Sequence, residues 1–310
     1  RRVREPAGAW LCADRRRRAA ASDLQPRAAC RRSACGPDAR LDMVGMFAGS
    51  SPKIDDRFTE SQVYNNQHGF CTLQAPAEDY HVYVCTDTHI TKTQKRWINF
   101  IETYRQDTLC PVAVHLGDII DAQNYFDEMY SAYQSVPMNP AKSDTLMAIA
   151  GNHDIYFKQW PQFIELFKTC TYYFIVRTPS GAQDLFICYD SADGTVGSKQ
   201  LQWLAETLQW ADTQVFRHIV ACTHTHFFKR DYSQGHTSNY TTEETFALLN
   251  LFAKHGVEML WSGHDHAREV TKVKGMTCIV VDSMKDGDKN PFYMLVTMGK
   301  SISYEFVPID

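Results

Sequence analysis

Long apolar segments are missing from this 310-residue chain. No run approaches the roughly 18 residues that a membrane-spanning helix needs, so we expect a protein that is soluble or anchored at a membrane surface. Closely spaced cysteine pairs are missing too, because none of the ten cysteines forms a CxxC motif. This spacing argues against a thiolate zinc site or a disulfide framework and favours buried structural thiols.

Lysine is absent from the first 40 residues, which contain eleven arginines and four acidic residues. That segment carries a charge of +7, so the remaining residues carry −11 within a formal net charge of −4. We expect 1–42 to be a disordered or foreign Arg-rich leader, 43–79 a linker or extension, and 80–310 the folded domain. The alternative for the arginines is a nucleic-acid-binding arm or a targeting segment.

The segment Met43–Ser51 resembles the end of a bacterial lipoprotein signal, with Ser50 at the position of the lipidated cysteine. This resemblance would place the protein in the bacterial cell envelope. The apolar stretch is very short and follows Asp42, which favours the alternative of a cytoplasmic protein.

From residue 80 onward, short apolar strands alternate with amphipathic helices, a pattern typical of layered α/β folds. Strands leading to polar motifs are expected at 80–86, 111–116, 145–150, 216–222 and 257–261. Helices are expected at 92–106, 122–133, 198–210 and 241–256. Residues 172–177 and 185–189 should form a hairpin, and residues 269–306 should add four strands.

The five strands that lead to polar motifs share one feature: each ends in side chains that can bind a metal. These motifs are Asp87-Thr-His89, Gly117-Asp-Ile-Ile-Asp121, Gly151-Asn-His-Asp154, Thr223-His-Thr-His226 and Gly263-His-Asp-His266. One such motif alone is as well explained by a turn, but ligand sites of α/β folds lie at the carboxyl ends of strands.

Seven side chains in these motifs are candidate ligands: Asp87, His89, Asp118, Asn152, His224, His264 and His266. Seven donors are too many for one tetrahedral ion and suit two ions that share a carboxylate. Nitrogen and oxygen donors without a thiolate favour Zn, Mn or Fe over Ca or Mg.

The motifs D-x-H, G-D-x-x-D, G-N-H-D, H and G-H-x-H, in this order over residues 87–266, resemble the calcineurin-like metallophosphoesterase superfamily. The resemblance implies an α/β (α+β) fold, a four-layer αββα sandwich of two mixed β-sheets flanked by helices. It also implies ligand roles. Asp87, His89 and His266 would hold the first ion, Asp118 would bridge, and Asn152, His224 and His264 would hold the second.

The resemblance further implies the chemistry. A hydroxide generated between two ions would attack phosphorus, while His153, oriented by a hydrogen bond to Asp154, would stabilise the phosphate or protonate the departing oxygen. Asp121 is expected to orient a ligand. His226 is either an extra donor or a loop neighbour of the metals, and Lys229 and Arg230 are candidate substrate contacts.

The expected function is hydrolysis of a small phosphoric ester, with a diester preferred over a monoester. Ala122 and Asp154 stand where serine/threonine protein phosphatases usually have Arg and Glu, which argues against protein dephosphorylation. A nuclease is the second enzymatic alternative, but a charge of −11 offers no basic surface for nucleic acid. A non-catalytic interaction module is the third alternative, and the intact ligand set argues against it. No oligomeric state follows from the sequence.

Overall fold

The computed structural model describes residues 70–121, 125–137, 139, 145–156, 159–167, 169–228 and 240–310, together with two short strands. These strands, β1 (Arg40–Asp42) and β2 (Val63–Asn65), pair antiparallel. Ser50, Ala122, Lys229 and Arg230 lie outside the described residues, so the predictions made for them stay predictions. Within the described ranges, no helix is long and apolar enough to cross a bilayer.

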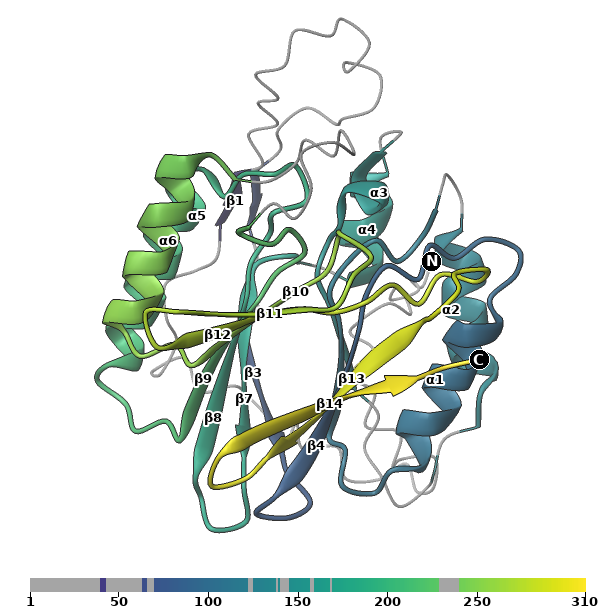
Figure 1. The fold of residues 1–310 in the computed structure, drawn as a ribbon, viewed down its shortest axis with the longest axis horizontal. Coiled ribbons are helices and arrows are strands. Elements are labelled where there is room, and N and C mark those ends of the chain that lie inside the picture. Colours follow the sequence, from purple (N-terminus) through teal and green to yellow (C-terminus); the bar gives the residue numbers. More distant parts are fainter. Residues whose placement is uncertain are drawn as a thin grey trace, which may run out of the picture.

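Two mixed β-sheets face each other in the centre of the fold (Figure 1). The seven-stranded sheet has the order β11 (Glu269–Val273), β12 (Met276–Val280), β10 (Met259–Ser262), β9 (His218–Cys222), β8 (Gln183–Cys188), β7 (Tyr172–Arg177), β3 (Phe70–Gln74). The five-stranded sheet has the order β14 (Ile302–Pro308), β13 (Phe292–Met298), β4 (Tyr80–Cys85), β5 (Val112–His115), β6 (Leu146–Ala148). The apolar inner faces of both sheets contribute to one buried cluster.

Helices cover the outer face of each sheet (Figure 1). The described helices are α1 (Lys95–Gln106), α2 (Phe126–Ser135), α3 (Asn152–Ile155), α4 (Trp160–Phe167), α5 (Gly197–Ala211) and α6 (Thr242–Lys254). In α1, the buried residues Trp97, Phe100, Ile101 and Tyr104 follow the spacing of one helix face. Helices α5 and α6 bury their apolar faces against the seven-stranded sheet. The predicted four-layer sandwich is therefore confirmed.

Several details differ from the expectations. The helices α3 and α4 were not expected, and α3 begins inside the Asn-His-Asp motif. Strand β3 lies in the segment for which a linker was predicted, and it pairs parallel with β7 at the edge of the sheet. The seven cysteines from Cys71 onward form no disulfide within the part of the chain that the structure describes, and six of them are buried, as expected for structural thiols.

The topology brings the polar motifs together. Strands β4, β5 and β6 run parallel, as do β9 and β10, so each set has its carboxyl ends at one edge of its sheet. A hydrogen bond links the loop after β4 to the loop after β5, because the Asp87 N–H donates to Gly117 O at 2.9 Å. The loop after β10 joins the loop after β9 through the Gly263 N–H, which donates to His224 O at 2.8 Å.

Candidate metal centre

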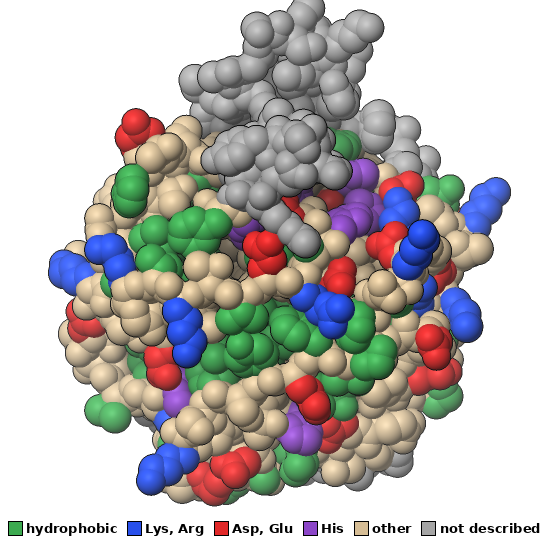
Figure 2. All heavy atoms as spheres, in the orientation of Figure 1, with side chains coloured by type: hydrophobic (Ala, Val, Ile, Leu, Met, Phe, Trp, Pro, Cys, Tyr) green, Lys and Arg blue, Asp and Glu red, His purple; other side chains and the backbone are tan. Residues whose placement is uncertain are grey.

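The candidate site lies where the loops after β4, β5, β6, β9 and β10 meet. In the space-filling view, histidine side chains gather at the upper end of the molecule, beside carboxylates and a few cations (Figure 2). Close backbone approach holds the loops in contact. A Cβ atom on Gly151 would clash with the backbone nitrogen of Asp118, and one on Gly263 would clash with the Thr86 hydroxyl. Glycine is therefore needed at both positions so that the loops can reach each other.

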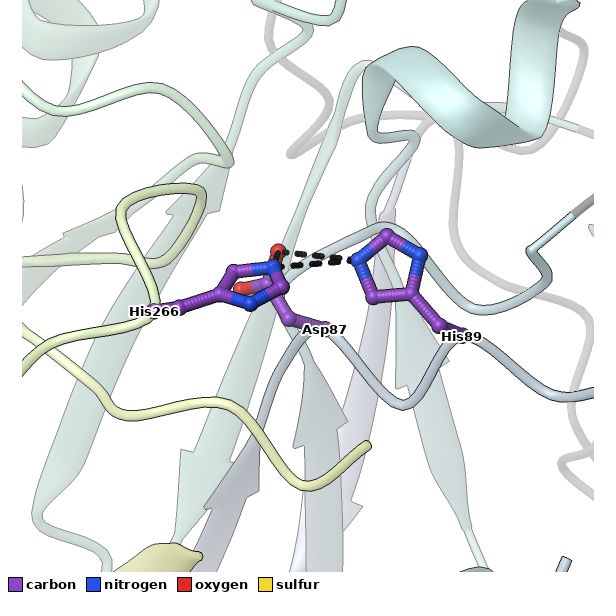
Figure 3. Close-up of side chains that lie close together, drawn as sticks. All are labelled: Asp87, His89 and His266. Atoms are coloured by element: carbon purple, nitrogen blue, oxygen red, sulfur yellow. Dashed lines mark hydrogen bonds and ion pairs between the residues drawn. The ribbon is translucent and has the colours of Figure 1, made fainter. Parts of the chain in front are cut away.

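A first cluster consists of Asp87, His89 and His266, whose ligand atoms lie within 4.8 Å of one another. The rings of His89 and His266 face each other beside the Asp87 carboxylate (Figure 3), with their Nε2 atoms 3.1 Å apart. The Oδ1 atom of Asp87 is 3.3 Å from His266 Nε2 and 3.9 Å from His89 Nε2. Two residues of the loop after β4 thus converge with one from the loop after β10.

A second cluster consists of Asp118, His224 and His264, again with ligand atoms within 4.8 Å. The Nδ1 atom of His264 lies 3.2 Å from His224 Nε2. Asn152 joins this cluster, because its Oδ1 atom lies 3.1 Å from the same His224 nitrogen. All seven side chains that the sequence singled out are therefore brought to the edge where the strands end.

The backbone at this site is strained. Positive φ angles occur at Asp87 (49°), His89 (41°), Asp118 (51°), His264 (74°) and His266 (48°). The left-handed region costs a non-glycine residue on the order of 1–3 kcal/mol, and such strain concentrates at functional sites. Among the described non-glycine residues, only Lys274 shares this conformation away from the two clusters.

The donors fit divalent cations. His224 donates its Nδ1–H to Leu116 O at 2.9 Å, so in the neutral ring the lone pair of Nε2 faces the Asn152 oxygen. Two acceptors facing each other repel unless a proton or a cation lies between them. Asp87 Oδ1 is buried and accepts no hydrogen bond from the described residues. Imidazole, carboxylate and amide donors without a thiolate suit Zn, Mn or Fe.

Comparison with known proteins agrees with this arrangement. The sequence model of the family described as calcineurin-like phosphoesterase matches residues 80–268. The chain belongs to the calcineurin-like phosphoesterase family. Membership of this family supports metal-dependent hydrolysis of phosphoesters. The two donor clusters lie inside the matched region.

Two solved structures share the phosphoesterase fold with this chain. One is GAP50, "the anchor in the inner membrane complex of Plasmodium", with 13% identity, a TM-score of 0.55, and coverage of 74% of this chain and 84% of that chain. The other is the purple acid phosphatase PPD1 from yellow lupin (Lupinus luteus) seeds, with 12% identity, a TM-score of 0.58, and coverage of 80% and 54%. At such identities the likeness concerns the fold alone. No curated protein matches the chain in sequence.

Charge within the phosphoesterase site is balanced between carboxylates and imidazoles. Burial works to raise the pKa of Asp87 and of Asp118, but His266 and His224 respectively outweigh it, so both pKa values lie well below the usual range. Burial likewise opposes a charge on those two histidines, yet the same carboxylates raise the pKa of each histidine to about 9. In contrast, burial lowers the pKa of His89 to about 4. The two carboxylates thus hold positive charge in the site.

The expected His153–Asp154 hydrogen bond is wrong. His153 instead donates its Nδ1–H to the backbone oxygen of Asp121 at 2.9 Å. Asp154 accepts the backbone N–H groups of Gly151 (2.8 Å), Ile119 (2.9 Å) and Ile120 (3.2 Å). Burial raises the pKa of Asp154 to about 8, and the nearby Asp118 adds to this. Asp154 therefore joins the loops after β5 and β6. The His153 ring is hydrogen-bonded to the Asp121 carbonyl instead.

Asp121 was expected to orient a ligand, and its Oδ1 atom lies 3.2 Å from His89 Nδ1, although that nitrogen forms no hydrogen bond with the described residues. Two further contacts at the site were not anticipated. Lys285 donates to the same Asp121 oxygen at 3.0 Å, and the Ser283 hydroxyl donates to the backbone oxygen of Asp87 at 3.0 Å. Both follow β12, which runs parallel to β10, so the polar residues at that strand's end were the signal that could have found them.

Three other histidines can be placed, among them His226, for which the sequence left two roles open. His226 is buried and bonds Asp265, between the two histidines of the loop after β10. His115 is a buried core histidine whose Nε2 atom lies 2.9 Å from the Thr88 hydroxyl oxygen. His218 is satisfied by Glu258 and by the Gly299 carbonyl.

Proposed function

We propose that the protein is a metal-dependent hydrolase of phosphoric esters with a preference for diesters. The observation that carries this proposal is the pair of donor clusters, each within 4.8 Å, at loops held in a strained conformation. Family membership supports phosphoester chemistry over other uses of such a centre.

The proposal assigns a role to each donor. Asp87, His89 and His266 would hold a first ion, and Asn152, His224 and His264 a second. The position of Asp118 supports a bridging role, because its two oxygens face histidines of different clusters. Oδ2 lies 3.6 Å from His89 Nε2, and Oδ1 lies 3.5 Å from His224 Nε2.

When bound, two divalent cations supply positive charge for the phosphoryl oxygens and lower the pKa of a nearby water. His153 would complete the site from the protein side. Its Nδ1–H is held by the Asp121 carbonyl, so Nε2 is the nitrogen that can exchange a proton with substrate. The ring lies against His89, with ring centroids 4.4 Å apart, beside the candidate ligands. From there it can donate a proton to a phosphate oxygen or to the departing oxygen.

The diester preference is carried over from the sequence motifs, and comparison of the two ester classes tests it. Charge at the site supports phosphate binding in general, because two bound divalent cations, together with His224 and His266, would outweigh Asp87 and Asp118. Lys285 is paired with Asp121 at 3.0 Å.

The test is an assay of protein loaded with Mn, Fe or Zn on paired chromogenic substrates, bis(p-nitrophenyl) phosphate and p-nitrophenyl phosphate. We expect turnover of both, faster for the diester, and joint loss of turnover and bound metal in Asp118→Ala. Turnover of the monoester alone would overturn the diester preference. Two bound ions without any turnover would overturn the hydrolase proposal in favour of an interaction module.

A further inference from the structure

The loop after β10 carries two candidate ligands that serve different clusters. We call Gly263–His266 the twin-histidine loop. Within it, His264 belongs to the second cluster and His266 to the first, and only Asp265 separates them. Both histidines have positive φ angles, 74° and 48°. The loop must therefore hold two strained residues in place while their rings point to separate sites.

The side chain of Asp265 is fixed by His226, which comes from the loop after β9. The Phe228 N–H donates to His226 Nδ1 at 2.9 Å, and an N–H group can only donate. The neutral ring therefore carries its hydrogen on Nε2, which donates to Asp265 Oδ2. Both ring nitrogens of His226 are thus engaged by the protein, which argues against a role as a further metal ligand.

Backbone contacts hold the other side of the twin-histidine loop. The His264 N–H donates to Asp87 Oδ2 at 2.9 Å, and the Gly263 N–H donates to His224 O at 2.8 Å. Both contacts lie before Asp265 in the chain. The bond from His226 is the side-chain link at the loop's midpoint, between the two histidines.

We propose that His226 is a positioning residue that, through Asp265, keeps His264 and His266 directed at two different metal ions. This inference rests on the proposed function, because it assumes that the clusters bind metal. In this role neither His226 nor Asp265 would itself be a metal ligand, because the ring nitrogens of His226 are engaged by Phe228 and Asp265. Loss of the bond would let the strained loop relax and would weaken both metal sites together, since one histidine of each depends on it.

The test compares metal binding by wild-type protein with four single variants and one double variant. His226→Ala and Asp265→Ala remove the bond from opposite sides, so the test does not depend on one of them folding. His226→Gln keeps a donor near the Nε2 position, and Asp265→Asn keeps an acceptor. Affinity and stoichiometry for Mn²⁺ and for Zn²⁺ are measured by equilibrium dialysis with elemental analysis, and the Co²⁺ absorption spectrum reports ligand geometry.

We expect each alanine variant to bind both ions about ten- to hundredfold more weakly, as is typical when a ligand loses its supporting hydrogen bond. The double variant should be no weaker than either single variant, and the Gln and Asn variants should recover most of the affinity and the wild-type Co²⁺ spectrum. His218→Ala, a buried histidine with two hydrogen bonds at the opposite end of β9, is the matched control and should bind like wild type.

Wild-type affinity in both alanine variants would overturn the inference. So would an Asp265→Asn variant as weak as Asp265→Ala, because the bond would then not be what holds the loop. These results are separable from failure of the proposed function. Wild-type protein that binds two ions, depends on His226 for them and hydrolyses no ester would sink the function and leave the inference standing.

Discussion

The side-chain amide of Asn152 is oriented by Tyr156: its Nδ2 atom donates to the tyrosine hydroxyl at 3.0 Å. Because the nitrogen is held there, the amide oxygen faces His224 Nε2 at 3.1 Å, where a second metal ion would lie. Tyr156→Phe removes only the hydroxyl. We expect affinity for the second ion to fall about fivefold, the value of one hydrogen bond of about 1 kcal/mol, with the first site unchanged.

Metal titration of Tyr156→Phe followed by elemental analysis checks this expectation. Tyr80→Phe is the matched control, because that buried hydroxyl donates to Asp184 at the opposite end of the sheets from the site. Equal loss of affinity in the two variants would show that Tyr156 acts through general stability instead.

His153→Ala should lower turnover on a phosphoester by a factor of roughly 10² to 10⁴, the usual contribution of a positioned acid or base. The ring is hydrogen-bonded to the Asp121 backbone oxygen, so its loss leaves the proposed ligands in place. We therefore expect bound metal and the melting temperature to stay close to wild type. Steady-state kinetics beside metal analysis tests this, and unchanged turnover would contradict it.

Asp154→Ala should behave in the opposite way. Three backbone N–H groups, of Gly151, Ile119 and Ile120, would lose a buried acceptor, at about 1–3 kcal/mol for each group left unsatisfied. We expect a lowered melting temperature in the metal-free protein, measured by thermal unfolding with chelator present. Full stability with lost turnover would instead return Asp154 to the role predicted from the sequence.

Local patterns in the sequence predicted a layered α/β fold and the seven proposed donors, and the family resemblance added the four-layer sandwich. An apolar strand ending in Asp87 or His264 is visible in the sequence, and parallel strands bring such ends to one edge. The contacts of Lys285 and Tyr156 could not be predicted from the sequence. The first joins residues 164 positions apart, and the second depends on where a helical turn directs its side chains.

The misassigned Asp154 shows how a short helix decides side-chain direction. The family resemblance implied a hydrogen bond between His153 and Asp154, which are adjacent in the chain. Helix α3 begins at Asn152, and successive helical residues point about 100° apart. Asp154, in the first turn, reaches back to the Gly151 N–H, while His153 turns toward Asp121. Pairing by adjacency fails wherever an unrecognised helical turn begins.

Removal of metal should destabilise the fold. Ligands that bind only the folded state add about 2.7 kcal/mol at a free concentration one hundred times the dissociation constant. Chelation should also leave the buried Asp87 Oδ1 with the His266 ring, 3.3 Å away, as an ion-pair partner in place of a metal ion. We expect the melting temperature to fall on chelation and to recover with Mn²⁺ or Zn²⁺, whereas Asp118→Ala should respond to neither treatment. A melting temperature indifferent to metal in the wild type would contradict the proposed centre.

Asp193 should make stability depend on pH. Burial, reinforced by the neighbouring Asp190, raises the pKa of Asp193 to about 8, while an unfolded aspartate titrates near 4. Between these values the folded state keeps a proton that the unfolded state has lost, so stability falls as pH rises through the window. In Asp193→Asn the amide oxygen can still accept the Thr195 N–H, which lies 3.1 Å from Asp193 Oδ1, without this titration. The loss between pH 5 and pH 8 should therefore shrink by an amount on the order of a few kcal/mol.

Denaturant unfolding of the chelated protein at pH 5, 6, 7 and 8 measures the effect, and Asp190→Asn is the comparator. Burial raises the pKa of Asp190 to about 6, so that variant should change the slope of stability against pH mainly below pH 6. Above pH 6 it should act only through the smaller contribution of Asp190 to the raised pKa of Asp193. Asp193→Asn should change the slope up to pH 8. Because the pKa of Asp154 is also raised, both variants should retain part of the pH dependence of stability. Slopes identical to wild type in Asp193→Asn would mean that its carboxyl group is ionised in the folded protein at neutral pH.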